Sequence, residues 1–460
     1  MPRSALAFAL AAALLLVLPA RAADPPQAWL VLSDLHFDPF AQPHLVDRLL
    51  AAPPDRWRAI FESSPSAPST TGNDTNDALL ESLLDGARNA APDPRVVIVA
   101  GDFLAGDFRA KFERTVKTHD DAAYRAFVDK TMAFLAWELQ AAFPRAHFIP
   151  VVGSDDGYCG SNASTPHDAF LARTAAVWAA SVGARDPNAF IAQFSTGGYY
   201  SVPLPIDGAQ AIVLNDVFWS AKYKNTCGDA TAAPGGDELS WLQATQAAIP
   251  AGTPVWMIAS IPPGIDVRAT LHAVPASSPV PFLADRYNDA FITALDSRST
   301  VVMAIAGHAH AQGFRAVGPD PSTPRAPMLV VPAVSPRDGD APAFTVLDVD
   351  PVTAQVDDAR IFSLKGKTDW RRAFDFATVY GRGTIDAAHL WGVQQLLFDN
   401  ERARGITDST WRAYWCANVA LTETDYSACA MPQIQRDLPP HPSPPPSPSP
   451  SPSPEPSAGT

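Results

Sequence analysis

Between residues 29 and 349, short apolar runs alternate with longer amphipathic stretches, and this alternation restricts the chain to a few folds. Apolar runs without polar interruptions are typical of strands buried on both faces of a mainly parallel sheet. The amphipathic stretches open with an acidic residue, which complements the positive end of a helix dipole. The pattern therefore predicts an α/β fold. We expect strands at residues 29–32, 96–100, 148–152, 211–214, 255–258, 301–306 and 328–331, and helices at residues 77–91, 120–143 and 237–248.

The N-terminal segment has the pattern of an export signal. Arg3 precedes an uncharged stretch rich in Ala and Leu, which ends at Pro19 and the small-x-small triplet Ala20-Arg21-Ala22. We predict a cleaved signal peptide over residues 1–22 and a secreted or periplasmic protein without a transmembrane anchor. The alternative is an uncleaved anchor, but the apolar stretch is short against the roughly 20 residues that span a bilayer.

The composition changes again towards the C-terminus. After residue 350 the strand signals fade, while residues 385–399 and 408–420 have helical patterns. We therefore predict a main domain over residues 26–350 and a smaller, mainly helical C-terminal unit over residues 351–436. Residues 437–460 consist largely of Pro and Ser, which form no ladder of backbone hydrogen bonds, so we expect an extended, disordered tail.

The charge balance excludes a general binder of polyanions. The chain has 34 Lys and Arg against 48 Asp and Glu, for a formal net charge of -14, and it contains no run of basic residues. Nucleic acids and anionic membranes are bound mainly through clusters of Lys and Arg, so we predict no nucleic-acid partner. Phosphate chemistry in such a chain would need a metal ion.

Four cysteines suit the oxidising compartment that the export signal predicts. Their spacing fits no zinc cluster. Four cysteines allow three pairings, of which we favour Cys159 with Cys227 and Cys416 with Cys429. Four buried thiols are the alternative.

Carboxylate and imidazole side chains directly follow three of the predicted strands. Because residues just past the carboxyl ends of strands gather at one edge of an α/β sheet, these side chains can converge although they lie far apart in the sequence. Asp and His are suitable ligands for Zn, Mn or Fe, and two such ions can clamp a phosphate and acidify a water molecule. The residues are Asp34 and His36 after the first predicted strand, Asp102 after the second, and His308 and His310 after the sixth.

In the order of these motifs the chain resembles the calcineurin-like metallophosphoesterases, whose pattern runs Asp-x-His, Gly-Asp, Gly-Asn-His-Asp/Glu, a lone His and Gly-His-x-His. More closely, it resembles their acid-sphingomyelinase-like phosphodiesterase branch, over roughly residues 29–344. The segments that carry the closer resemblance are Gly101-Asp102-Phe103-Leu104-Ala105, Gly153-Ser154-Asp155-Asp156, Tyr158-Cys159-Gly160, Tyr223-Lys224-Asn225-Thr226-Cys227 and Ile261-Pro262-Pro263-Gly264.

The resemblance implies a four-layer α/β/β/α sandwich and hydrolysis of a phosphodiester by a metal-bound hydroxide. The substrate would be a small molecule or a lipid headgroup. The resemblance also implies a centre of two divalent ions such as Zn, Mn or Fe. The first ion would be bound by Asp34, His36, His310 and the bridging Asp102, and the second by Asp102 and His308 with two further ligands.

Several positions depart from the family's pattern. The Asn of the Gly-Asn motif is Ser154, and the His expected before Ile-Pro-Pro-Gly is Ser260. A His that the branch carries four residues after the bridging Asp, where it acts on the leaving group, is Gly106 here, and a second catalytic His of some members is Asp155. A Ser hydroxyl is a neutral and poor ligand, so we expect the second site to bind its ion weakly or to lack it.

Two hypotheses remain. In the first, the protein is a metal-dependent phosphodiesterase with one or two ions per chain, in which Asp102 and Asp155 are catalytic. Its second site would be rebuilt from Asp155, Asp156 or Asp107, in an oxygen-rich form suited to Mn, Mg or Ca. The alternative role for these carboxylates is to cap a loop or helix. In the second hypothesis, the protein is a catalytically inactive pseudoenzyme that binds a phosphorylated ligand or a protein partner.

Overall fold

The computed structural model describes residues 25–227, 233–273, 278–296, 300–318, 325–404 and 408–437. The predicted signal peptide and all but the first residue of the predicted tail lie outside the described residues. None of the helices in these ranges is both long and apolar enough to cross a membrane.

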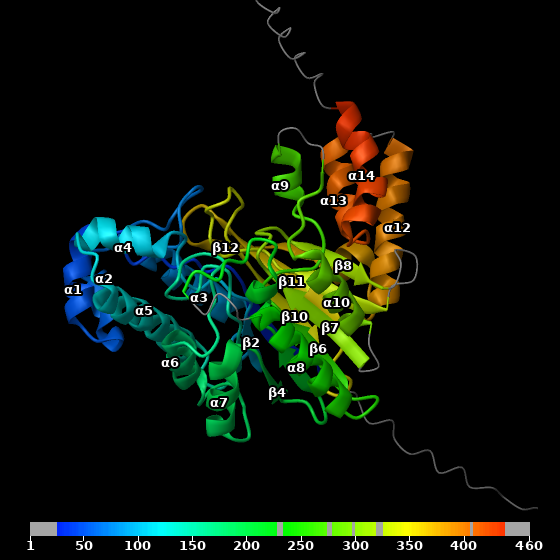
Figure 1. Ribbon diagram of the computed structural model, residues 1–460. Coiled ribbons are helices and arrows are strands. Elements are labelled where there is room, and N and C mark those ends of the chain that lie inside the picture. Colours follow the sequence, from blue (N-terminus) through cyan, green and yellow to red (C-terminus); the bar gives the residue numbers. More distant parts are fainter. Residues whose placement is uncertain are drawn as a thin grey trace, which may run out of the picture.

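Two six-stranded sheets form the centre of the described structure (Figure 1). The strands of the first sheet are β1 (Gln27–Leu32), β2 (Val96–Val99), β3 (His147–Pro150), β10 (Ala343–Val349), β11 (Val356–Lys365) and β12 (Asp369–Asp375). The strands of the second sheet are β4 (Tyr200–Pro203), β5 (Gln210–Val213), β6 (Pro254–Ile258), β7 (Thr300–Ala306), β8 (Gly313–Val317) and β9 (Ala326–Val330).

Each sheet contains a block of parallel strands, which lies at one end of the first sheet and in the middle of the second. The first sheet has the order β12-β11-β10-β1-β2-β3, in which β1, β2 and β3 are parallel. The second has the order β4-β5-β6-β7-β9-β8, in which β5, β6, β7 and β9 are parallel. All seven predicted strands are present, as β1, β2, β3, β5, β6, β7 and β9.

Helices cover the outer faces of the sheets and complete the α/β/β/α layering, which confirms the predicted fold class (Figure 1). On the first sheet lie α3 (Asp77–Ala90) and α5 (Asp121–Ala142), and on the second lie α8 (Pro234–Ala248) and α10 (Asp285–Leu295). Asn76 starts α3 by accepting a hydrogen bond from the Leu79 amide. The remaining helices are α1 (Val46–Ala51), α2 (Trp57–Glu62), α4 (Phe108–Val116), α6 (Ala169–Trp178), α7 (Pro187–Gly197), α9 (Val267–His272), α11 (Phe376–Tyr380), α12 (Ala387–Arg404), α13 (Ser409–Ala417) and α14 (Glu423–Asp437).

The two sheets pack face to face around a shared core. The ring centroids of Trp29 in β1 and Trp256 in β6 lie 4.5 Å apart. Along β6 the side chains alternate, so that Trp256 and Ile258 join this core. Val255 and Met257 face the other way and pack in the cluster that contains residues of α8 and α10. This period of two follows from the strand geometry and explains why the run is apolar at every position.

The region after residue 350 begins with two strands that the sequence pattern did not predict, and its helices follow them. β11 and β12 continue the first sheet as antiparallel strands beside β10, and helices begin only at α11. β12 lies at the edge of the sheet, and all its side chains are at least partly exposed. Such strands lack the continuous apolar run of a buried parallel strand, which is why their signal was missed. The division into two domains at residue 350 stays a prediction.

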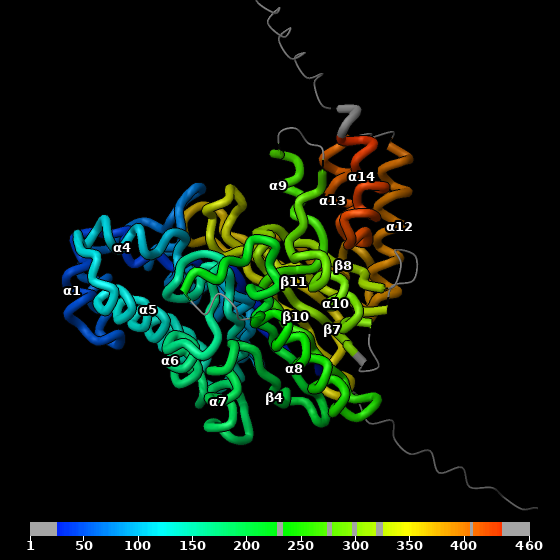
Figure 2. Tube along the Cα trace, in the orientation of Figure 1, coloured from blue at the N-terminus to red at the C-terminus, as the bar shows by residue number. Residues whose placement is uncertain are grey.

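The C-terminal helices α12, α13 and α14 stand together beside β8 (Figure 1). α13 also contacts α9, although about 140 residues separate them in the sequence (Figure 2). A disulfide between Cys416 and Cys429 joins α13 to α14, and a second disulfide links Cys159 to Cys227. Both predicted cysteine pairs are therefore present.

Candidate metal centre

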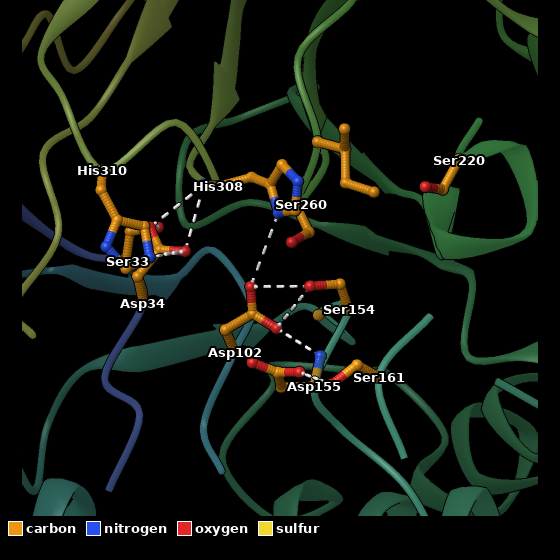
Figure 3. A network of polar contacts seen from close by, with 12 residues as sticks. Ser33, Asp34, Asp102, Ser154, Asp155, Ser161, Ser220, Ser260, His308 and His310 are labelled. Carbon is orange, nitrogen blue, oxygen red and sulfur yellow. Dashed lines mark hydrogen bonds and ion pairs between the residues drawn. The ribbon is translucent and has the colours of Figure 1, made fainter. Parts of the chain in front are cut away.

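The predicted ligands meet at one edge of the paired sheets, in the loops that follow the carboxyl ends of parallel strands (Figure 3). β1 leads to Asp34 and His36, β2 to Asp102, and β7 to His308 and His310. The substituted positions lie at the same edge, because Ser154 follows β3 and Ser260 follows β6. The site is therefore built by both sheets.

Three of the predicted ligands form a compact, buried group. The ligand atoms of Asp34, His36 and His310 all lie within 4.8 Å of one another. The Nε2 atoms of His36 and His310 are 3.1 Å apart, and His310 Nε2 lies 3.4 Å from Asp34 Oδ1. Asp34 is further held by the His308 amide, at 3.1 and 3.0 Å from its two carboxylate oxygens.

The surroundings of His36 suit a cation ligand. Its Nδ1 lies 3.2 Å from the Leu104 carbonyl oxygen and 3.4 Å from Asp155 Oδ2, which are acceptors, and 3.2 Å from Arg337 Nη1, which is a donor. In the tautomer with the proton on Nδ1, the ring donates to Leu104 and Nε2 offers a lone pair to a cation. Two imidazole nitrogens and a carboxylate oxygen are a donor set that fits Zn, Mn or Fe.

Asp102 belongs to a second cluster, which faces His308 rather than His36. Its carboxylate accepts hydrogen bonds from the Asp155 amide at 2.6 Å and from Ser154 Oγ at 3.2 Å, and His308 Nδ1 lies 3.8 Å away (Figure 3). Burial raises the pKa of Asp102, but His308, His36 and the Asp155 amide outweigh it and hold the pKa below its usual range. The carboxylate is therefore an anion next to His308.

The second cluster contains two hydroxyls where the family pattern has stronger ligands. Ser154 donates to Asp102, and the Ser260 hydroxyl is buried without a hydrogen-bond partner among the described residues. Ser260 fits tightly against Gly101, since a Cβ on Gly101 would lie 2.4 Å from Ser260 Oγ. The Ser260 amide donates to the buried carboxylate of Asp216, which fixes this loop.

The three acidic residues considered as replacements take different positions. Asp156 accepts hydrogen bonds from the amides of Phe103, Leu104 and Gly153, which is the role of a loop cap. Asp107 is exposed at the start of α4. Asp155 points its Oδ2 towards His36 Nδ1, while Ser161 donates to its Oδ1. Of the three, only Asp155 directs its carboxylate at the ligand groups.

Arg337 is a site residue that the sequence analysis missed. Its Nη1 lies 3.2 Å from Asp155 Oδ2 and 3.2 Å from His36 Nδ1, and 3.5 Å from Asp74 Oδ1. The guanidinium fills the space beside Gly106, where the branch carries a histidine. Arg337 lies in the loop after β9, a parallel strand whose position was predicted. It comes several residues after the end of β9 and belongs to no motif, so the sequence holds no signal that could have found it.

All five predicted ligands have a left-handed backbone. The φ angles are 52° at Asp34, 42° at His36, 55° at Asp102, 62° at His308 and 52° at His310. Such angles are uncommon for residues other than glycine, and they cluster at functional sites. Here they turn each side chain out of its strand direction and into the site.

The chain is similar in sequence to named phosphodiesterases. It is 26% identical over 328 residues to sphingomyelinase phosphodiesterase D of Dictyostelium discoideum. The aligned part covers 67% of this chain and 66% of that protein, which is just under two thirds of its length. It is 21% identical over 389 residues to human acid sphingomyelinase-like phosphodiesterase 3b, with 78% and 77% covered. No family model matches the chain.

Solved structures with a related architecture are more distant. A dimetal phosphatase from Danio rerio is 13% identical, with 79% of this chain and 100% of that chain covered and a TM-score of 0.42. A calcineurin-like phosphoesterase from Bacillus subtilis is 10% identical, with 90% and 97% covered and a TM-score of 0.30. The assignment rests on the sequence relatives, the order of the strand-end motifs and the two-sheet fold. By these criteria the chain is similar to the acid-sphingomyelinase-like branch of the calcineurin-like metallophosphoesterases.

Proposed function

We propose that this protein is an exported phosphodiesterase that works with one firmly held divalent ion. The observation that carries the proposal is the convergence of Asp34, His36 and His310 into one buried donor set. Zn, Mn and Fe suit these ligands. The second position, next to Asp102 and His308, offers two ligands and two neutral hydroxyls, and we expect it to bind an ion weakly or not at all.

The side chains around the donor set would have different roles in hydrolysis. A divalent ion bound there supplies Lewis-acid polarisation of a phosphoryl oxygen and acidification of water. Arg337 adds a permanent positive charge and N–H donors suited to a phosphoryl or leaving-group oxygen. Asp155 pairs with Arg337 and lies beside His36 Nδ1, so it holds both the guanidinium and the ligand ring in place. Asp102, kept anionic, orients His308.

The substrate class that we propose is a phosphodiester of a small molecule or a lipid headgroup. The support comes from the relatives, whose names describe sphingomyelinase-type phosphodiesterases. A nucleic acid is a poor fit because the chain carries a formal charge of -14 and no basic run. Export is supported by the two disulfides, which are rare in reducing compartments.

A pseudoenzyme is the second candidate function, and a specific contact favours it. Ser154 donates a hydrogen bond to Asp102, the carboxylate that bridges two ions in the family pattern. An Asp102 satisfied by a hydroxyl and an amide has less need of a cation. In that case the protein would bind a phosphorylated ligand or a protein partner without cleaving it.

Metal content and hydrolysis, measured on the same preparation, test these proposals. The secreted protein is purified without chelator, incubated with Zn, Mn or Mg, desalted, and analysed for metal per chain and for cleavage of an activated aryl phosphodiester. We expect about one ion per chain and cleavage that Asp34→Ala abolishes. Two ions per chain would contradict the single-ion proposal. One ion without any cleavage would favour the pseudoenzyme, and cleavage unchanged in Asp34→Ala would reject this site.

A further inference from the structure

A cavity lies beside the ligand groups, between the two sheets and the C-terminal helices. Its volume is about 330 Å³. It is lined from the second sheet by β8 and β9, from the first by β10 and β11, and on the remaining side by α12 and α13. This volume is within the range of small-molecule sites, which are roughly 300 to 1,000 Å³. The lining is mostly aromatic and aliphatic, including Phe282, Phe314, Ile361, Phe374, Trp411 and Trp415.

Arg315 places a buried positive charge against this apolar lining. Its side chain is only 6% exposed, and Nη1 donates to the Phe314 carbonyl oxygen at 2.9 Å. Nε has no hydrogen-bond partner, and no carboxylate of the described residues lies within ion-pair distance of the guanidinium. Burial lowers the pKa of Arg315 to about 10, so the group stays charged at neutral pH. A buried charge without a counter-ion is strongly destabilising, so the cavity favours an anion.

A second polar atom on the opposite sheet is also without a partner. Thr345 of β10 lines the cavity, is 2% exposed, and has no hydrogen-bond partner for Oγ1 in the described structure. A hydroxyl can donate to an anionic oxygen. The lining also contains Arg268, which pairs with Asp340, and Asp266, whose carboxylate accepts from the Ala269 amide. Arg315 Nε and Thr345 Oγ1 are the lining groups that lack a partner among the described residues, and they lie beside a large apolar surface.

We propose that this cavity binds a single-chain amphiphile with a carboxylate head, such as a fatty acid. The carboxylate would pair with Arg315, and the alkyl chain would lie along the aromatic lining. This inference does not depend on the phosphodiesterase proposal, because the residues that carry it lie outside the ligand groups. The site borders the metal centre, since Phe282 lines the cavity and packs edge-on against His308 at 5.7 Å between ring centroids.

Binding of dodecanoate below its micelle concentration tests the proposal without any measurement of activity. Titration calorimetry on the full protein should give one site per chain, and the Trp411 and Trp415 emission should change on binding. Dodecyltrimethylammonium, which has the same chain and the opposite charge, should not compete. The variant Arg315→Met keeps an apolar side chain in place and should weaken dodecanoate at least tenfold while leaving dodecanol binding unchanged.

Two controls keep the outcome clear. Arg315→Met should unfold at the same or a higher temperature, because it removes an unpaired buried charge. Arg412→Met alters a nearby guanidinium that packs on Trp415 but is not part of the lining, and it should bind dodecanoate as the unmodified protein does. Equal affinity for dodecanoate and dodecanol, equal affinity in Arg315→Met, or more than one ligand per chain would overturn the proposal.

Discussion

The guanidinium of Arg337 occupies the space in which a side chain at position 106 would have to lie. A Cβ built on Gly106 would come within 2.3 Å of Arg337 Nη1 and 2.7 Å of Cζ. The resemblance places a histidine at this position, and a side chain there requires the guanidinium to move. This chain therefore has a permanently charged group where the acid-sphingomyelinase-like pattern has a titratable one, and the exchange removes one source of pH dependence from the site.

Restoring the family residue at position 106 should work only when Arg337 is also removed. Gly106→His alone forces a close contact with the guanidinium, and we expect a loss of roughly 1–3 kcal/mol in the free energy of unfolding. Arg337→Ala in the same chain should recover most of this loss. Chemical denaturation of both single variants and the double variant measures the coupling. Strictly additive changes would show that the two positions do not compete for space.

Arg337 should matter for turnover more than for folding. If it binds a phosphoryl or leaving-group oxygen, Arg337→Ala should lower kcat by about 10²-fold, as for other lost electrostatic donors. Arg337→Lys should retain part of the rate, because the charge remains while the planar fork is lost. Arg360→Ala removes a comparably buried guanidinium that pairs with Asp348 far from the site, and its rate should be unchanged. Equal rates in Arg337→Ala and the unmodified protein would leave Arg337 a structural residue.

Metal affinity should depend on Asp34 and His310 separately. Even residues that only orient metal ligands typically change affinity 10- to 100-fold, so Asp34→Asn and His310→Gln should each weaken the ion by at least this factor. Competition with a fluorescent chelator measures the affinity directly. Asp107→Asn changes an exposed carboxylate and serves as the control. If metal affinity fell only in Asp107→Asn, the ion would be bound at a different site.

His147 predicts a pH-dependent stability that is independent of the site. It is partly buried at the start of β3, and burial together with the charge of Arg95 lowers its pKa below the usual 6.5. The unfolded chain then binds more protons than the folded chain at pH values below about 6.5, so stability falls as the pH drops through this range. His147→Asn should flatten this part of the melting temperature profile between pH 7 and pH 5. A profile that is the same in His147→Asn and in the unmodified protein would contradict this prediction.

The two disulfides should contribute unequally to stability. Cys416 and Cys429 are 13 residues apart, and chain entropy gives about 3 kcal/mol for a loop of this size. Cys159 and Cys227 are 68 residues apart, for which the same relation gives about 4 kcal/mol. Denaturant unfolding of the two Cys→Ala pairs measures both values. A larger loss from the shorter loop would mean that local packing of α13 on α14 outweighs the loop entropy.

The buried parallel strands were the predictable part of the fold. β2 and β6, for example, are apolar at nearly every position because both of their faces are covered. β8 and β12 escaped prediction because edge strands mix charged and apolar residues, as in Gly313–Val317 with Arg315. The missed β8 is also the strand that brings Arg315 to the cavity beside the C-terminal helices.

The site was predictable where it depends on strand order and not where it depends on loop paths. Asp34, Asp102 and His308 follow parallel strands directly, so their convergence is a consequence of sheet topology. Arg337 comes several residues after β9 and belongs to no motif, so only the three-dimensional path of its loop shows that it reaches Gly106. Strand order also does not predict that the Asp102 carboxylate faces His308 and not the group of Asp34, because this depends on side-chain rotamers.

The left-handed backbone at the five predicted ligands lowers the stability of the fold while it places the side chains that would bind an ion. Among the described residues, ten that are not glycine have positive φ, and these five are half of them. Each costs roughly 1–2 kcal/mol that a glycine would not incur. Any selection for heat resistance alone would therefore favour glycine at positions 34, 36, 102, 308 and 310. A library screened only for melting temperature should thus accumulate molecules that fold better and bind no ion, and such a screen would need a metal-dependent readout to keep the site intact.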